Sequence, residues 1–156
     1  MPSPTEFQYT VLRLVPSVER GERMNVGVVV FCRQLDFLQA RAHIDEDRLA
    51  ALAPGLDPDE VRPALRALCD VVAGDRAAGP LAALPASERF GWVVAHSSTI
   101  IQPSPSHTGL TEDPAATLER LFGTLVDTPG QRRARVVVRV ALVAPCGANS
   151  IIEGRE

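Results

Sequence analysis

Glu22 and Asn25 are the two residues whose types and spacing could do chemistry most directly. They lie in the polar stretch 20–25, immediately before the apolar run 26–32. A carboxylate at the end of a buried strand could act as a base or a metal ligand, and the nearby amide could orient a bound molecule. The alternative is local: Glu22 pairs with a neighbouring arginine and Asn25 caps the turn. Polar residues at turns usually have such local roles, so we favour the second interpretation.

A basic cluster is the second candidate. Arg41 and His43 share one face of a predicted strand over residues 37–44, and Arg13 is expected on a neighbouring strand. Such a cluster could bind phosphate or carboxylate, with His43 as an acid or base. A sheet with one face exposed to solvent shows the same alternation of polar and apolar residues without any function, and we favour that alternative.

Other catalytic patterns are weak. Five hydroxyl and imidazole residues could host a Ser–His pair, but no Gly-x-Ser-x-Gly turn is present: Ser97, Ser98, Ser104, Ser106 and His107. The three histidines and three cysteines form no Cys-x-x-Cys or His-Glu-x-x-His pattern, so we expect no metal site and no cofactor. The sequence leaves open whether the protein is an enzyme, and favours the answer that it is not.

Composition excludes several function classes. All sixteen basic residues are arginine, so the chain has no lysine for a Schiff base or a phosphate-binding loop. The net charge of −3 and the aromatic content of 4% argue against nucleic-acid binding. One basic cluster, Arg132 to Arg139, could meet nucleic acid or an acidic protein, but we favour a solvated strand edge.

The chain has the size and composition of one globular domain. At 156 residues and 46% hydrophobic, we expect a single domain over 1–156, with loose ends at 1–5 and 147–156. The apolar run 26–32 is too short to cross a membrane, and the N-terminus does not resemble a signal peptide. Three widely spaced cysteines indicate reduced thiols, which predicts a cytoplasmic location.

The elements that must position these residues follow from hydrophobic periodicity. We predict strands over residues 7–15, 26–32, 37–44, 99–102 and 136–143, the first three as an antiparallel meander. Gly27 within its strand indicates a bulge or a close backbone contact. Helices are predicted over 45–52, from Asp57 to Gly74 despite Pro63, over 87–95 and from Asp113 to 126, with loops at 73–85 and 103–109. The fold class is α+β: a mostly antiparallel four- to five-stranded sheet with three to four helices packed on one face.

Several stretches resemble an uncharacterised bacterial family, domain of unknown function thirty thirty-seven. They are Tyr-Thr-Val-Leu-Arg at 9–13, Arg-Gly-Glu at 20–22, Asn-Val-Gly-Val at 25–28, Arg-Phe-Gly-Trp at 89–92, and the segment from Ser98 to Pro114 with its following helix. The resemblance covers about residues 7–128, and the Glu-x-x-Asn-Val-Gly-Val block is its most specific part.

The resemblance implies a compact α/β bacterial domain without an agreed activity. Members resemble small proteins sometimes encoded beside a HipA-like kinase-fold protein, which implies a protein partner. We therefore expect an accessory protein-binding domain. The alternative is a metal-dependent phosphoryl-transfer or nucleic-acid-processing enzyme that uses Glu22, Asn25, Arg41 and His43. The full set of binding candidates is Arg13, Glu22, Asn25, Arg41, His43, Gln102 and His107.

Overall fold

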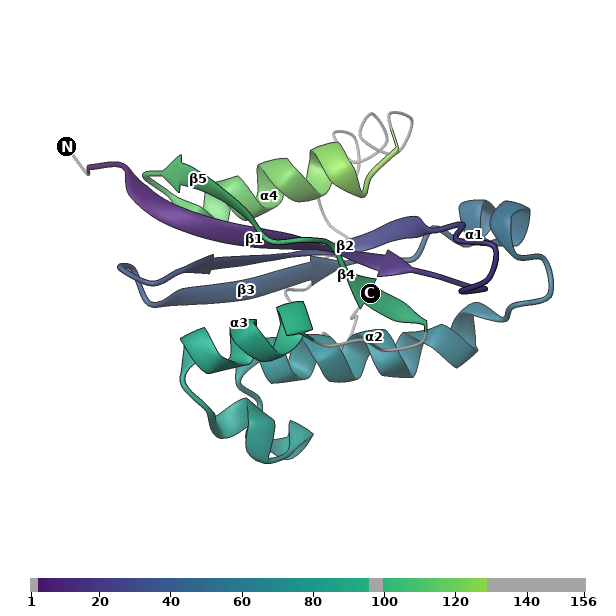
Figure 1. Cartoon of the computed structure of the whole chain (residues 1–156), viewed down its shortest axis with the longest axis horizontal. Coiled ribbons are helices and arrows are strands. Elements are labelled where there is room, and N and C mark those ends of the chain that lie inside the picture. The colour runs from purple at the N-terminus through teal and green to yellow at the C-terminus, as the bar shows by residue number, and fades with distance from the viewer. Residues whose placement is uncertain (1–2, 96–99, 129–156) are drawn as a thin grey trace, which may run out of the picture.

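The protein folds around a five-stranded antiparallel sheet. The computed structural model describes residues 3–95 and 100–128 (Figure 1). Its strands are β1 (Thr5–Leu14), β2 (Met24–Cys32), β3 (Phe37–Ala42), β4 (Ile101–Pro103) and β5 (His107–Thr111). Their order is β3-β2-β1-β4, and β5 pairs with the first half of β1. This arrangement confirms the expected α+β class with an antiparallel sheet.

β2 lies in the middle of the sheet, as its apolar sequence predicted. It pairs with β1 on one side and with β3 on the other. Every residue from Val26 to Cys32 is buried, because side chains on both faces of β2 are covered. Alternate residues serve two separate cores: Val29 and Phe31 belong to one, Val28 and Val30 to the other.

Gly27 marks an irregularity in the pairing of β1 and β2. Leu12 lies opposite Gly27 whereas Arg13 lies opposite Asn25, so Val26 is an extra residue on β2. This is a β-bulge. A Cβ atom at Gly27 would lie 2.9 Å from the carbonyl oxygen of Arg41. Both expectations for this glycine, the bulge and the close backbone contact, are confirmed.

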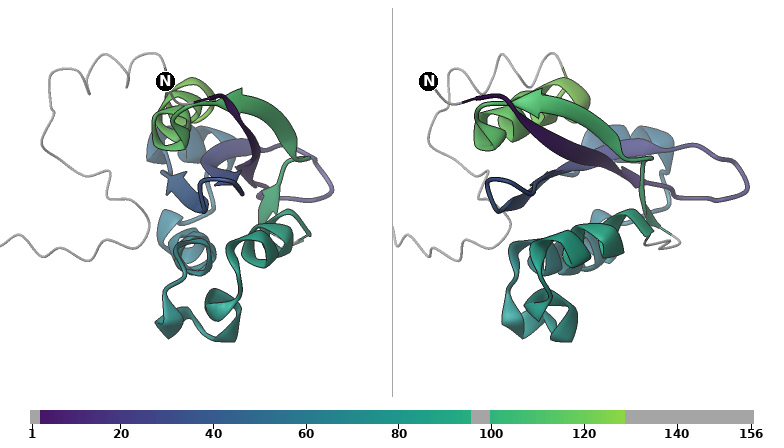
Figure 2. Two further views of the ribbon diagram at one scale, coloured as in Figure 1. Left: turned by 90° about the vertical axis from the view of Figure 1, so that its left-hand side faces the viewer. Right: turned by 60° about the vertical axis from the view of Figure 1, so that its left-hand side comes forward.

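Helices cover both faces of the sheet, so the expectation that they pack on one face was wrong. The helices are α1 (Glu46–Leu52), α2 (Pro58–Ala73), α3 (Ala86–Ala95) and α4 (Pro114–Leu125). Figure 2 shows α4 over one face and α2 and α3 over the other. The physical reason is the apolar run of β2 itself, which exposes hydrophobic side chains on both faces and needs a cover on each. None of these described helices is long and apolar enough to cross a membrane.

The ends of the helices follow the sequence signals closely. Asp45, Asp57 and Asp113 each cap the N-terminus of a helix by accepting a backbone N–H bond. Gly74 ends α2 in the left-handed conformation, with φ 74°. Pro63 lies inside α2 without ending it. The predicted loop at 73–85 contains two short 3₁₀ helices, η1 (Arg76–Ala78) and η2 (Pro80–Ala83).

Other boundaries differ from the predictions. β1 begins at Thr5, within the segment expected to be loose, and β4 extends through Pro103. The predicted loop at 103–109 contains the start of β5, whose residues are mostly exposed and are held by pairing with β1. The predicted strand at 136–143, the arginine cluster 132–139 and the segment 147–156 lie outside the described residues.

Candidate functional site

Three of the predicted binding residues form a row across the sheet. Arg13 on β1 lies directly opposite Asn25 on β2 and opposite Gln102 on β4. Directly opposed residues of antiparallel strands lie on the same face, with Cβ atoms about 4.5–5.5 Å apart. All three side chains are half-buried, and they lie on the face that carries α4. The structure thus brings together residues that are up to 89 positions apart, counting from Arg13 to Gln102.

Arg13 is a half-buried cation that has no counter-charge among residues 3–95 and 100–128. Its guanidinium forms no hydrogen bond or ion pair with the residues described. Burial, and secondarily the positive charge of Arg23, lower the pKa of Arg13 below its usual value. The side chain remains charged at neutral pH. It is therefore a positive charge held in an environment that favours the addition of an anion.

Asn25 connects the row to α4. Its side-chain amide donates a hydrogen bond of 2.9 Å to the carbonyl oxygen of Leu125 in the last turn of the helix. Carbonyl groups at a helix C-terminus have no partner within the helix, so this bond satisfies one of them. Asn25 therefore positions α4 over the sheet.

Glu22 lies apart from the row, on the exposed β1–β2 connection. Its carboxylate accepts hydrogen bonds from the Arg20 guanidinium at 2.7 Å and 3.3 Å. That hydrogen bond, and secondarily the charge of Arg20, lower the pKa of Glu22. The pairing matches the local alternative given for this residue.

Arg41 is covered by α4, so the alternative of a solvated sheet face was wrong for this residue. It forms an ion pair with Glu119, and its guanidinium carbon lies 5.3 Å from the centre of the Phe122 ring. Only 14% of its side chain is exposed. Such a cation–π contact and ion pair together hold β3 against α4.

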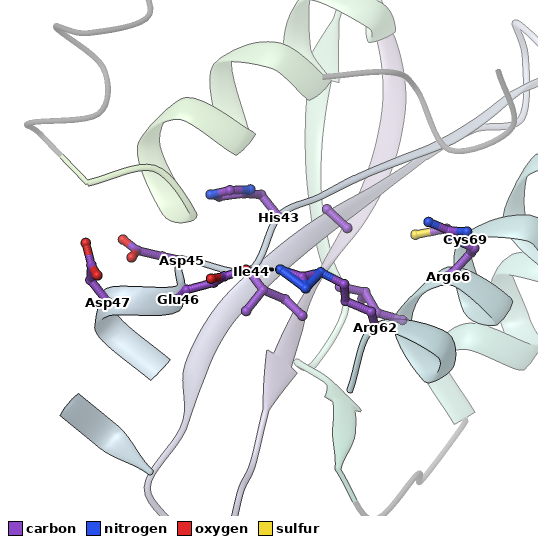
Figure 3. A pocket seen from close by; sticks show the side chains of 10 residues that line it. His43, Ile44, Asp45, Glu46, Asp47, Arg62, Arg66 and Cys69 are labelled. Atoms are coloured by element: carbon purple, nitrogen blue, oxygen red, sulfur yellow. Dashed lines mark hydrogen bonds and ion pairs between the residues drawn. The ribbon is translucent and has the colours of Figure 1, made fainter. Parts of the chain in front are cut away.

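His43 lines a groove of about 550 Å³ between the β3–α1 connection and α2 (Figure 3). One wall carries the carboxylates of Asp45, Glu46 and Asp47, and the other carries Arg62 and Arg66. Ile44, Leu65 and Cys69 supply its apolar surface. The volume lies within the range of small-ligand sites, about 300–1,000 Å³.

Ion pairs already engage some of the charged side chains that line the groove. Arg62 forms ion pairs with Glu46 and with Asp59, the latter at 2.8 Å. Asp47 and Arg66 are exposed and form no ion pair with described residues. The contribution of α2 to this groove was not among the sequence-based predictions. The spacing 62, 65, 66 and 69 could have indicated it, because these positions share one helical face.

The remaining candidates lie elsewhere. His107 is exposed on β5, with its ring centre 5.1 Å from that of Tyr9. Ser104, considered for a Ser–His pair, is buried, accepts a hydrogen bond of 2.9 Å from the Val11 N–H, and contacts the Thr10 hydroxyl. Ser104 therefore joins the chain after β4 to β1. Within residues 3–95 and 100–128, no group of three or more His, Cys, Asp or Glu side chains could hold a metal ion.

Comparison with known proteins identifies a family. No curated protein and no solved structure matched the chain. A family model described as "Protein of unknown function (DUF3037)" matches residues 9–126, which include the row, the groove and the four described α-helices in full. The match covers more than half of the chain and agrees with the resemblance of its motifs. The protein therefore belongs to this family of proteins of unknown function.

Proposed function

We propose that this protein is an accessory protein-binding domain, and that an extended segment of its partner adds to the outer edge of β3 beside Ala42. The observation that carries the proposal is the position of this strand. β3 is the outer strand of the described sheet, and both α2 and α4 contact it. In Figure 2 its edge lies between the two helices. The outward backbone groups of an outer strand can pair with a further strand, and here the half-buried Ala42 is the accessible position, since Leu38 and Ala40 are buried.

The backbone of β3 indicates which groups would pair. The His43 N–H donates a hydrogen bond of 2.8 Å to the Val26 carbonyl oxygen, so the backbone groups of His43 point toward β2. Backbone groups alternate in direction along an antiparallel strand. Those of Leu38, Ala40 and Ala42 therefore point away from β2. Leu38 and Ala40 are buried, so the half-buried Ala42 is the pairing position for a partner segment.

The groove beside His43 extends this edge and supplies a charge preference. It begins at Ala42, where the paired part of β3 ends. The groove carries three carboxylates, Asp45, Glu46 and Asp47, against the two guanidinium groups of Arg62 and Arg66. This excess of negative charge favours a basic side chain in the partner segment beside Asp47. The family resemblance makes a HipA-like kinase-fold protein of the same genome the first partner to test.

The substitution Ala42→Pro tests the pairing edge. Proline removes the outward N–H and places ring atoms at the edge, while the pairing with β2 does not use this N–H. We expect the wild-type protein to form a complex with the HipA-like protein that survives size-exclusion chromatography. Titration calorimetry should show at least tenfold weaker binding for Ala42→Pro, with an unchanged circular dichroism spectrum.

Two substitutions of an acidic residue by arginine, one inside the groove and one outside it, test the charge preference. Asp47→Arg should weaken the complex several-fold, whereas Glu112→Arg, the same change at an exposed residue outside the groove, should leave it unchanged. Absence of a complex would exclude the HipA-like partner, and wild-type affinity in Ala42→Pro would exclude the edge. A dimer of the protein alone that Ala42→Pro abolishes would show self-association instead.

No specific observation in the described chain favours the alternative of a metal-dependent enzyme. Its four residues do not share one cavity: Glu22 is paired on an exposed loop, Asn25 bonds to α4, and Arg41 is covered. Of the four, His43 lines the groove. We therefore propose the protein-binding function only.

A further inference from the structure

A second groove continues the first one along α1. The first groove begins at Ala42 and is lined by Glu46 and Asp47. A neighbouring groove of about 490 Å³ is lined by the same two residues, by Ala50 and by the α1–α2 connection, residues 54–58. Positions 46, 47 and 50 share one face of the helix. Because two residues line both grooves, the grooves are continuous from the end of β3 to the start of α2.

Both grooves carry an excess of negative charge. The second groove is lined by the carboxylates of Glu46, Asp47 and Asp57, and none of the described residues that line it is basic. In the first groove, three carboxylates stand against two guanidinium groups. Complementary charge steers a partner to a surface and suppresses wrong partners. The two grooves therefore favour a positively charged occupant.

Apolar side chains contribute to the lining of both grooves. Ile44 and Leu65 line the first groove, and Ala50, Leu56 and Pro58 line the second. Successive side chains of an extended segment point in opposite directions. A segment in which apolar and basic residues alternate can therefore direct one set of side chains to these apolar surfaces and the other set to the carboxylates.

Arg62 lies where the two grooves meet. It forms ion pairs with Glu46, which lines both grooves, and with Asp59 (Figure 3). The side chains of these two partners are 61% and 81% exposed. Ion pairs between exposed side chains contribute little to stability. A basic side chain of an occupant can therefore replace Arg62 at Glu46.

We infer that the partner segment proposed for β3 continues through both grooves, and that it is an extended segment with alternating basic and apolar residues. This inference rests on the proposed function and adds the second groove to the binding surface. α1 has seven residues and is about 10 Å long, a length that about three extended residues span. The partner segment therefore has about three residues beyond those that pair at Ala42.

An octapeptide of alternating lysine and valine, acetylated and amidated at its ends, is the probe for the test. We expect titration calorimetry with the full chain to show saturable binding that weakens as salt is added. Ala50→Arg, which adds a cation to the second groove, should weaken binding at least fivefold. Ala51→Arg is the matched control, because Ala51 is also an exposed residue of α1 but lines neither groove. It should leave binding unchanged.

A second pair of substitutions tests the exchange at Glu46. Arg62→Gln should strengthen binding of the lysine peptide at least threefold, because it leaves Glu46 free for a basic side chain of the peptide. Arg48→Gln makes the same change of charge at an exposed residue of α1 that lines neither groove. It should leave binding unchanged.

The outcomes separate this inference from the proposed function. An unchanged affinity of Ala50→Arg overturns the inference, as does an octapeptide of alternating glutamate and valine that binds as tightly as the lysine peptide. If Ala42→Pro weakens binding of the lysine peptide and Ala50→Arg does not, pairing at β3 stands and the second groove is excluded. If Ala50→Arg weakens binding and Ala42→Pro does not, the grooves bind the segment and pairing at β3 is excluded.

Discussion

At Gly27 the backbone of β2 lies so close to that of β3 that a side chain does not fit. An added Cβ would meet the Arg41 oxygen at 2.9 Å, the Leu12 methyl at 3.1 Å and the Ala42 Cβ at 3.2 Å. The first of these is a backbone atom of β3, so it cannot move away by a change of rotamer. The bulge and the β2–β3 pairing therefore both require glycine here.

Gly27→Ala should reduce the free energy of unfolding by about 1–3 kcal/mol, the usual range for overpacking a closely packed site. Urea denaturation followed by circular dichroism measures this change. Gly91→Ala is the control, because a Cβ there meets nothing within 4 Å and the residue lies in α3. It should raise stability by about 0.5–1 kcal/mol. Equal effects of the two substitutions would contradict this account of Gly27.

Residue types predicted the faces of the strands better than the contacts on those faces. The alternation over 37–44 placed Arg41 on the face opposite that of Leu38 and Ala40, and the structure confirms this for Arg41, which contacts Phe122 of the α4 core, while Leu38 and Ala40 belong to the other core. It could not show that Glu119 and Phe122 cover Arg41, because those residues are about 80 positions away in the chain. The same limit applies to the row of Arg13, Asn25 and Gln102, which only the strand register brings together.

At the scale of elements, Asn25 is the hydrogen-bonded connection between β2 and the end of α4. Asn25→Ala should leave the Leu125 carbonyl unpaired and cost about 1–2 kcal/mol of stability. Amide exchange should accelerate most in the last turn of α4. Gln102→Ala is the control, since its amide shares the same sheet face without a bond to described residues. Uniformly faster exchange, or an equal effect of the control, would contradict the connecting role.

Element boundaries were predictable where a local chemical signal exists. Each aspartate expected at the start of a helix accepts a backbone N–H there, because this bond depends on only three or four consecutive residues. β5 had no such signal. Its sequence, His-Thr-Gly-Leu-Thr, lacks apolar alternation, and even Leu110 is 72% exposed. Pairing with β1 makes it a strand, and pairing partners are not visible in a local pattern.

At the scale of the whole molecule, β2 is shared by two cores. The α2–α3 core contains Val29 and Phe31, and the α4 core contains Val28 and Val30. The apolar run of β2 predicted burial on both faces. The sequence does not show which helix covers which face of the sheet, because each helix has one apolar stripe that could cover either face. The order of α2, α3 and α4 along the chain does not decide between them.

Because both cores contain β2, damage to either should unfold the whole domain. Phe122, which is 1% exposed, fills the α4 core, and Leu68, which is 4% exposed, fills the other. Phe122→Ala should cost about 3–5 kcal/mol and Leu68→Ala about 2–5 kcal/mol. The sheet separates the two sites, so their effects should add to within about 0.5 kcal/mol, which is measurable by urea denaturation where the double variant remains folded.

Each single variant should show one transition, coincident by circular dichroism and tryptophan fluorescence, since a shared strand couples the two layers. The single tryptophan, Trp92, packs against the α2–α3 core. If Phe122→Ala instead lost helical signal at a lower urea concentration than Trp92 fluorescence, the α4 layer would be an independent folding unit and β2 would not couple the two cores.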